Sequence, residues 1–164
     1  MALRRVVKEG EEVLRKVAKP VDKFDDRLSE LIDDMIETMK DYDGAGLAAN
    51  QVGILKRVVV INTGEETGVK EFVNPEIISA EGEQKAIEGC LSIPGKWGYT
   101  LRPAKARIKA QDRHGEWFEM EGEGLLARAF CHETDHLNGK LFVEKVVEWY
   151  EPEDEESPKK SKRK

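Results

Sequence analysis

Two helix-forming segments enclose a series of short β-like runs, and this order restricts the folds open to the chain. Within residues 25–42, apolar side chains recur at intervals of three and four, which is the stripe of an amphipathic helix. These side chains are Leu28, Leu31, Ile32, Met35, Ile36 and Met39. A second helix is predicted over 124–138, where Gly139 would serve as the C-terminal cap.

Between the two helices, runs of β-like composition are separated by Gly and Pro. The runs cover 57–61, 72–79, 106–111 and 116–120, and His114-Gly115 is the predicted turn between the last two. Strands gathered between two helices are typical of an α+β domain built on antiparallel sheet. We therefore predict an α+β fold with antiparallel β-sheets packed around the second helix and with an N-terminal amphipathic helix.

The last fourteen residues differ in composition from the rest of the 164-residue chain. Residues 151–164 carry five acidic and five basic side chains and no large apolar one. Such a segment cannot bury enough surface to offset the entropy of ordering. We predict a single domain over 1–150 and a charged, disordered tail over 151–164, whose basic end could contact an acidic partner such as ribosomal RNA.

Composition also excludes several classes of protein. The formal charge of −6 argues against a DNA-binding body, because nucleic-acid-binding surfaces are usually basic. No apolar run approaches the roughly 20 residues of a membrane span, and no apolar segment follows the basic N-terminal residues as it would in a secretory signal. Since Cys90 and Cys131 are the only cysteines, no disulfide framework is expected, and we predict a cytoplasmic protein without a membrane partner.

The segment His132-Glu133-Thr134-Asp135-His136 carries the strongest chemical signal. On a helix, positions i and i+4 lie on one face, so His132 and His136 can bind the same metal ion. Glu133 follows the first histidine and can take a proton from water that the metal activates. Because the segment falls within the predicted second helix, we predict an HExxH metal site on that helix.

The third ligand decides the reaction class, and the residues leave several alternatives open. An HExxHxxGxxH site is excluded because Phe142 stands where the last histidine would be. Glu144 or Glu148 as the third ligand would make the chain a zinc-dependent peptidase. Cys131 adjoins His132, but one residue along a helix turns the side chain by about 100°, so its sulfur is expected to point away.

Cys90 is the better candidate for the third ligand. It stands in the segment Glu88-Gly89-Cys90-Leu91-Ser92. A further segment has small side chains along most of its length and ends in a side-chain amide. It is Gly44-Ala45-Gly46-Leu47-Ala48-Ala49-Asn50-Gln51. Glycines there allow a ligand to approach the backbone closely, and Gln51 can donate a hydrogen bond to it.

Together these three segments resemble the peptide deformylase family. The family pattern is GxGLAAxQ, then EGCLS, then HExDH, and this chain has GAGLAANQ, EGCLS and HETDH in the same order. The resemblance spans most of residues 1–147. It implies an enzyme that removes the N-formyl group from N-formylmethionyl nascent peptides and releases formate.

The resemblance also implies a role for each motif residue. Cys90, His132 and His136 would hold one divalent metal ion, which is Fe²⁺ in the cell and can be replaced by Zn²⁺, Ni²⁺ or Co²⁺. Glu133 would act as general acid and base. Gln51 and the backbone N–H of Leu91 would stabilise the oxyanion.

For the substrate, the resemblance implies an extended peptide beside a strand at residues 44–47. The substrate-binding residues would be Gly44, Ala45, Gly46, Glu88, Gly89 and Cys131. The pocket for the methionine side chain is expected to draw on Cys131, Glu88 and residues 125–129.

Two positions depart from the family pattern. The residue before the first histidine is often Gln in the family and is Cys131 here. An Arg that pairs with the motif glutamate is expected shortly after EGCLS, but Trp97 stands near that place, and Arg102 is the nearest alternative partner for Glu88.

A non-enzymatic metal-binding module is the third hypothesis, and Glu133 argues against it because a structural site needs no base.

Overall fold

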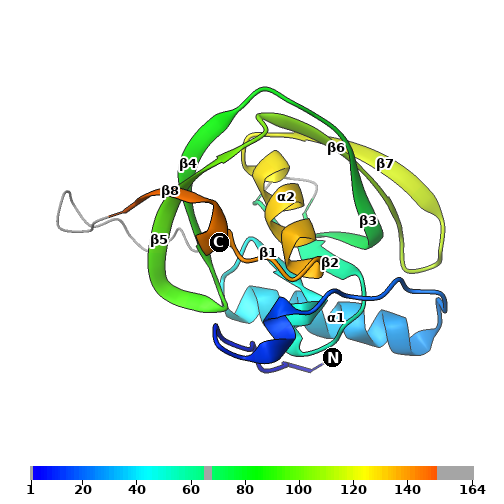
Figure 1. The fold of residues 1–164 in the computed structure, drawn as a ribbon. Coiled ribbons are helices and arrows are strands. Elements are labelled where there is room, and N and C mark those ends of the chain that lie inside the picture. Colours follow the sequence, from blue (N-terminus) through cyan, green and yellow to red (C-terminus); the bar gives the residue numbers. More distant parts are fainter. Residues whose placement is uncertain (1, 65–67, 151–164) are drawn as a thin grey trace.

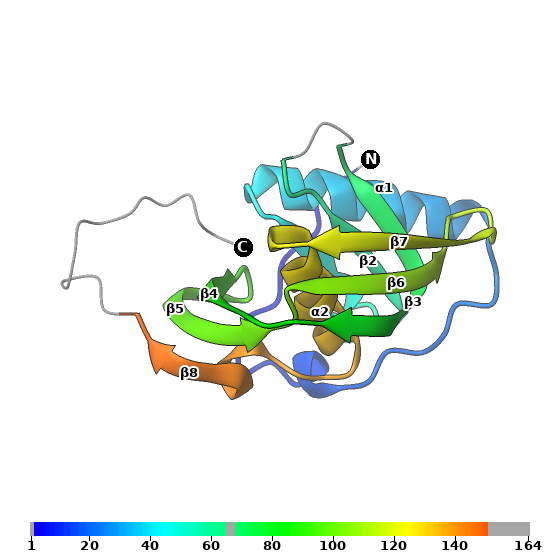
Figure 2. The same ribbon diagram turned by 90° about the horizontal axis from the view of Figure 1, so that it is seen from above.

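The computed structural model describes residues 2–64 and 68–150. They form a mixed α+β fold with antiparallel sheets and few helices, as the sequence predicts (Figures 1 and 2). The tail predicted over 151–164 lies outside the described residues. Neither α-helix of the described part combines the length and hydrophobicity that crossing a membrane requires.

Strands of the described residues are arranged in two antiparallel sheets. The larger sheet has the order β1-β2-β3-β6-β7 and the smaller one the order β4-β5-β8. Their bounds are β1 (Gly46–Ala48), β2 (Val58–Ile61), β3 (Lys70–Glu81), β4 (Gln84–Cys90), β5 (Ile93–Arg102), β6 (Lys105–Gln111), β7 (Trp117–Glu123) and β8 (Val146–Trp149).

The four predicted β runs correspond to β2, β3, β6 and β7, and the turn at His114-Gly115 is also present. There the N–H of Gly115 donates to the carbonyl oxygen of Asp112 at 3.0 Å, and Gly115 has a φ of 88°. Composition and periodicity did not predict β1, β4, β5 or β8, and a strand at 44–47, which overlaps β1, followed only from the family resemblance. These strands are short or contain Gly and Pro, which weaken the β pattern.

Two α-helices and three short 3₁₀ turns complete the described elements. They are η1 (Glu12–Arg15), α1 (Asp26–Asp41), η2 (Ala49–Val52), α2 (Leu125–Leu137) and η3 (Phe142–Lys145). Helix α1 begins after Asp25, whose carboxylate accepts from the N–H of Leu28 and caps the helix. Gly139, two residues after α2, has a φ of 76°, which suits the left-handed conformation that follows many helices.

The larger sheet is covered on both faces, one by each helix. The side chains of strand β2 alternate between the two faces. Val58 and Val60 belong to the core cluster that contains the apolar stripe of α1. The intervening residues Val59 and Ile61 belong to the cluster that contains Phe130 of α2. Successive side chains of a strand point to opposite faces, so β2 is buried on both sides and reads as a continuous apolar run. Figures 1 and 2 show α1 on the outer face and α2 between the two sheets.

A third core cluster joins the N-terminal segment to the smaller sheet and the region after α2. Its buried members are Val7, Leu14, Cys90, Ile93, Leu141 and Phe142. This cluster fixes the end of β4 beside α2. The motif EGCLS therefore meets the HETDH segment of α2, although 39 residues lie between the two motifs in the sequence.

Candidate metal centre

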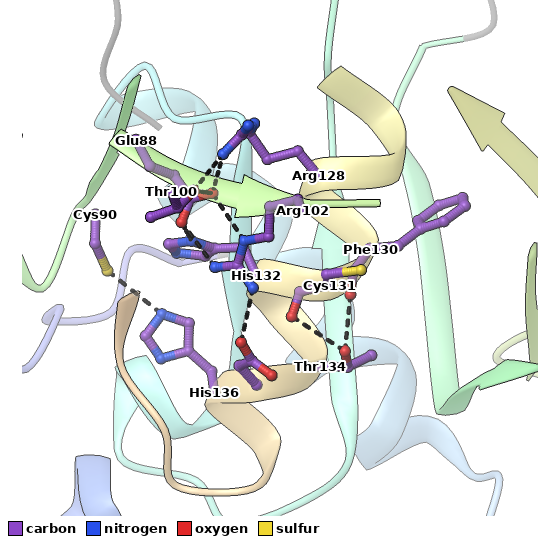
Figure 3. Close-up of polar contacts among 11 residues, drawn as sticks. Glu88, Cys90, Thr100, Arg102, Arg128, Phe130, Cys131, His132, Thr134 and His136 are labelled. Atoms are coloured by element: carbon purple, nitrogen blue, oxygen red, sulfur yellow. Dashed lines mark hydrogen bonds and ion pairs between the residues drawn. The ribbon is translucent and has the colours of Figure 1, made fainter. Parts of the chain in front are cut away.

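Cys90, His132 and His136 form a buried cluster between β4 and α2 (Figure 3). Their ligand atoms all lie within 4.8 Å of one another, and the Sγ of Cys90 is 3.3 Å from the Nε2 of His136. Each residue is no more than 6% exposed. The two histidines share one face of α2, and Cys90 ends the neighbouring strand β4. This arrangement brings the three donors to one point.

The donor set fits a divalent metal ion. A tetrahedral ion with a metal–sulfur bond of about 2.3 Å and metal–nitrogen bonds of about 2.1 Å keeps its ligand atoms roughly 3.4 to 3.6 Å apart. The observed sulfur–nitrogen distance of 3.3 Å lies close to this spacing. A thiolate with two imidazoles suits Zn²⁺ and Fe²⁺ and does not suit Mg²⁺ or Ca²⁺, which prefer oxygen ligands.

Glu88 orients the first histidine of the cluster. Its Oε1 lies 3.1 Å from the Nδ1 of His132, which leaves Nε2 of that ring to face the other two ligands. Such a carboxylate behind a ligating histidine is common at metal sites. Burial would lower the pKa of His132, but its contacts with Cys90 and Glu88 outweigh burial and raise the pKa to about 10. Burial lowers the pKa of His136 well below its usual value, and the charge of His132 lowers it further.

Two arginines and a threonine hold Glu88 in turn. The Nη2 of Arg102 lies 2.7 Å from Oε1 of Glu88, and the Nη1 of Arg128 lies 2.6 Å from Oε2. Thr100 donates from its hydroxyl to Oε2 at 3.0 Å. Arg102 also reaches Asp135 of the HETDH segment at 2.8 Å. Burial would raise the pKa of Glu88, but His132 and Arg102 outweigh it and lower the pKa, so the carboxylate stays ionised.

Glu133 lies against the backbone of β1. Its side chain is almost fully buried, and a Cβ added at Gly46 would collide with its carboxylate. Any residue other than glycine at position 46 would therefore displace Glu133.

Gln51 and Leu91 lie beside the cluster. The Nε2 of Gln51 is 3.5 Å from the Sγ of Cys90, and its Oε1 accepts from the N–H of Ala48 at 2.9 Å. The side chain of Leu91 packs against Gly44, where a Cβ would approach it to 2.9 Å. Gln51 thus contacts the ligand sulfur, and Leu91 follows the ligand Cys90 directly in the chain.

A small cleft opens next to the cluster. It is lined by Ala45, Gly46, Glu88, Leu125, Arg128, Ala129, His132 and Glu133. Gly44, Gly89 and Cys131 are not among its lining residues, although the sequence predicted them as substrate-binding. Figure 3 shows Cys131 on the side of α2 away from Cys90, as expected from its one-residue offset from His132, and burial raises the pKa of its thiol.

The alternative carboxylate ligands do not reach the cluster. Glu144 pairs with Arg15, and Glu148 pairs with Lys85 at 2.9 Å. Both carboxylates are more than two-fifths exposed, unlike the three cluster residues. The hypothesis of a peptidase with one of them as third ligand is therefore wrong.

Three other positions can now be placed. Phe142, which occupies the place of a third histidine, stacks on His132 with ring centroids 6.1 Å apart. His114 is exposed in the turn before β7. Trp97 packs against Gly89, and Arg102 takes the ion pair with Glu88 that an arginine near position 97 would otherwise make.

Arg128 was not predicted as a partner of Glu88. The signal was present, because Arg128, His132 and His136 are four residues apart and therefore share one face of α2. A buried arginine on the ligand face requires a carboxylate partner nearby. Thr100 carried no comparable signal, since its role depends on the pairing of β4 with β5.

The three buried donors Cys90, His132 and His136 lie beside the HExxH glutamate and next to a cleft. This fold and this site are those of a metal-dependent hydrolase. The family model for polypeptide deformylase matches residues 3–151 of the chain. The chain belongs to this family, whose members remove the N-formyl group from nascent peptides. It is an enzyme of protein biosynthesis, and its family depends on a metal ion.

Individual relatives agree with this assignment. A peptide deformylase from Caldicellulosiruptor bescii is 55% identical over 154 residues, which are 94% of this chain and 92% of the relative. The crystal structure of a peptide deformylase from Legionella pneumophila is 48% identical and covers 89% of this chain and 87% of its own, with a TM-score of 0.86. A class I type b peptide deformylase from Acinetobacter baumannii, solved with Met-Ala-Ser bound, is 36% identical, with a TM-score of 0.85 over 88% of this chain and 100% of its own.

Glu88→Gln is expected to destabilise the protein by about 3–5 kcal/mol at pH 7, because two buried guanidiniums lose their compensating charge. The folded-state pKa of Glu88 is lowered, so its ionic contribution is present above the unfolded pKa of about 4.3. This contribution is lost as the pH falls through the lowered folded pKa. Denaturant unfolding of both proteins should therefore show a difference that narrows below about pH 4.

The control for this measurement is Glu76→Gln, on an exposed position of β3. It should change the free energy of unfolding by less than about 0.5 kcal/mol at any pH. Equal effects of the two substitutions would contradict the assigned importance of Glu88.

Gly46→Ala is expected to displace the carboxylate of Glu133 while leaving the three ligands in place. A shift of about 1 Å in a catalytic group can cost about 100-fold in rate. Formate release should fall by that order, and the metal content measured by elemental analysis should stay unchanged. Normal turnover in this variant would show that the position of Glu133 does not matter.

Proposed function

We propose that Cys90, His132 and His136 hold one divalent cation and that Glu133 moves the proton in hydrolysis of the formamide of N-formylmethionyl peptides. The observation that supports this most strongly is the meeting of the three buried donors beside the buried carboxylate of Glu133. In this proposal α2 is the central HExxH helix, α1 is the N-terminal amphipathic helix, and residues 1–150 act as one catalytic domain.

Each group of the site has a separate task. A divalent cation supplies a Lewis acid that lowers the pKa of water from 15.7 toward about 7. Glu133 takes the proton of the attacking water and delivers it to the leaving amine. The side-chain amide of Gln51 and the backbone N–H of Leu91 stabilise the negative charge that develops on the formyl oxygen.

We propose Fe²⁺ as the ion used in the cell, with Zn²⁺, Ni²⁺ or Co²⁺ able to replace it. One thiolate and two imidazoles accept each of these ions, and affinity alone favours Zn²⁺ over Fe²⁺. Elemental analysis of protein purified without oxygen, paired with activity per metal ion, identifies the ion that supports turnover. Full activity with zinc alone would argue against the iron proposal.

The substrate is proposed to lie extended between β1 and β4. These strands are the end strands of their sheets, so their free backbone groups can pair with a peptide. The residues that flank this channel are Gly44, Ala45 and Gly46 on one side and Glu88 and Gly89 on the other. The Acinetobacter baumannii relative binds Met-Ala-Ser, which supports a peptide with an N-terminal methionine as the ligand here.

The remaining proposals concern the surroundings of the enzyme. We propose that it acts in the cytoplasm on nascent chains, without binding DNA or a membrane. The basic end of the tail, 159–164, is proposed to make a weak contact with the ribosome, because ribosomal RNA is a dense polyanion.

The metal-loaded protein is expected to release formate from formyl-Met-Ala-Ser and to release no acetate from acetyl-Met-Ala-Ser. Glu133→Gln should keep the metal and lose about 100- to 10,000-fold in rate. Cys90→Ala should lose the metal itself, as elemental analysis would show. Absence of formate release by the metal-loaded wild type would overturn the proposed function.

Ala129→Leu is expected to raise KM for formyl-Met-Ala-Ser by at least about 10-fold, because the larger side chain fills the cleft that the methionine would occupy. Cys131→Ala is the matched control on the same helix, since Cys131 does not line the cleft. Steady-state kinetics of both variants measure the effect. Equal KM values in the two variants would place the methionine side chain elsewhere.

A further inference from the structure

Gln51 is held by a buried hydrogen bond that the proposed reaction does not itself require. Its Nε2 donates to the Oγ of Ser92 at 3.1 Å, and both side chains are no more than 1% exposed. Ser92 is the residue that ends the EGCLS motif, two positions after Cys90. It reaches Gln51 of the GAGLAANQ motif across 41 residues of sequence.

The two ends of the Gln51 amide have different partners, and this fixes which end faces the cluster. The N–H of Ala48 donates to Oε1 at 2.9 Å, so the oxygen points into its own loop. The nitrogen then points toward Ser92 and toward the Sγ of Cys90, 3.5 Å away. A reversed amide would place two donors together at Ala48, so the contact with the N–H of Ala48 fixes the orientation of the amide.

The backbones of the two residues are tied to one segment of the chain. The N–H of Val7 donates to the carbonyl oxygen of Gln51 at 2.7 Å, and the N–H of Glu9 donates to the carbonyl oxygen of Ser92 at 2.8 Å. The N-terminal segment therefore spans both residues and sets the distance between their backbones. The hydrogen bond between the side chains completes a closed frame.

A planar amide nitrogen carries two hydrogens in fixed directions. When one hydrogen is directed at Ser92, the direction of the other is also determined. We infer that Ser92 is a positioning residue, which holds the amide of Gln51 so that its second N–H, facing the Sγ of Cys90 at 3.5 Å, lies beside the ligands where the formyl oxygen would gain negative charge. This inference rests on the proposed role of Gln51 in deformylation. It assigns Ser92 no contact with substrate or metal.

A neutral hydroxyl suits this task. Its oxygen accepts from Gln51 without bringing a charge that would compete for the developing oxyanion. Loss of the hydroxyl leaves the amide of Gln51 held through Oε1 by Ala48 alone, so the donor is present but is aimed less often. The expected loss is therefore smaller than the loss caused by removing the donor.

A double-mutant cycle tests the inference, with kcat and KM for formyl-Met-Ala-Ser measured on metal-loaded enzyme. Gln51→Ala should lower kcat by about 100- to 1000-fold, and Ser92→Ala should lower kcat by about 10-fold with little change in KM. Because Ser92 acts through Gln51, adding Ser92→Ala to Gln51→Ala should cause no further loss. Multiplication of the two losses, or an unchanged kcat in Ser92→Ala, would overturn the inference.

A second measurement is independent of activity. The chain has four Asn and three Gln, so the side-chain amide region of a nitrogen-15 spectrum of the zinc-loaded protein contains few signals. The Gln51 signal is assigned by its absence in Gln51→Ala. It should shift and exchange faster with solvent in Ser92→Ala, and an unchanged signal would overturn the inference.

Thr38→Val is the control for loss of a buried hydroxyl. The hydroxyl of Thr38 accepts from the backbone N–H of Arg4 at 2.9 Å, and it contacts no residue of the cluster. This variant should leave both kcat and the Gln51 signal unchanged. If the wild type releases no formate, the proposed function fails, while the amide spectra still decide whether Ser92 holds Gln51.

Discussion

The buried carboxylate of Glu88 is the interaction on which the site depends. It binds Arg102 and Thr100 from its own sheet and Arg128 and His132 from α2. A single unpaired charge in this position would be very costly, so the carboxylate and its partners must form together. Their formation docks α2 on the smaller sheet in one register, and that register places His132 and His136 opposite Cys90.

The larger sheet supports this arrangement from the other side. Apolar residues on one face of the sheet pack against α1, and those on the other face pack against α2. Helix α2 thus has an apolar side toward the larger sheet and a polar side toward the smaller one. Apolar contacts are tolerant of small shifts, whereas the hydrogen-bonded ion pairs are directional. The apolar side holds the helix in place, and the polar side determines its exact position.

Much of the fold could be predicted from residue periodicity. The apolar stripe of α1 and the strongly apolar sequence of β2 are local patterns, and the structure has a helix and a strand where these patterns predict them. Strands β4 and β5 could not be predicted, because glycines and Pro94 interrupt their pattern and their stability comes from pairing with each other. Strand β1 could not be recognised from its residue pattern either, because three residues are too few to distinguish a strand from a loop.

The prediction of the site was uneven for the same reason. Cys90 could be named from its motif, but nothing local to Thr100 or Ser92 reveals their partners, which lie on other elements. Glu144 and Glu148 were chemically acceptable ligands, and only the fold shows that they pair with basic side chains elsewhere. Chemistry that depends on residue type is readable in a sequence, whereas contacts that depend on pairing between distant strands are not.

The charges of the site are divided by position. The ionised groups that hold His132, namely Glu88, Arg102 and Arg128, lie behind the ligand, and Asp135 on Arg102 balances their remaining positive charge. The groups beside the cluster where charge would develop, Gln51 and Ser92, are neutral and hydrogen-bonded. Neutral donors fixed in advance can stabilise a developing oxyanion without reorganising during the reaction. A charged side chain in place of Ser92 would draw the amide of Gln51 toward itself. The enzyme would then bind the transition state less strongly relative to the substrate, and catalysis depends on this difference in binding.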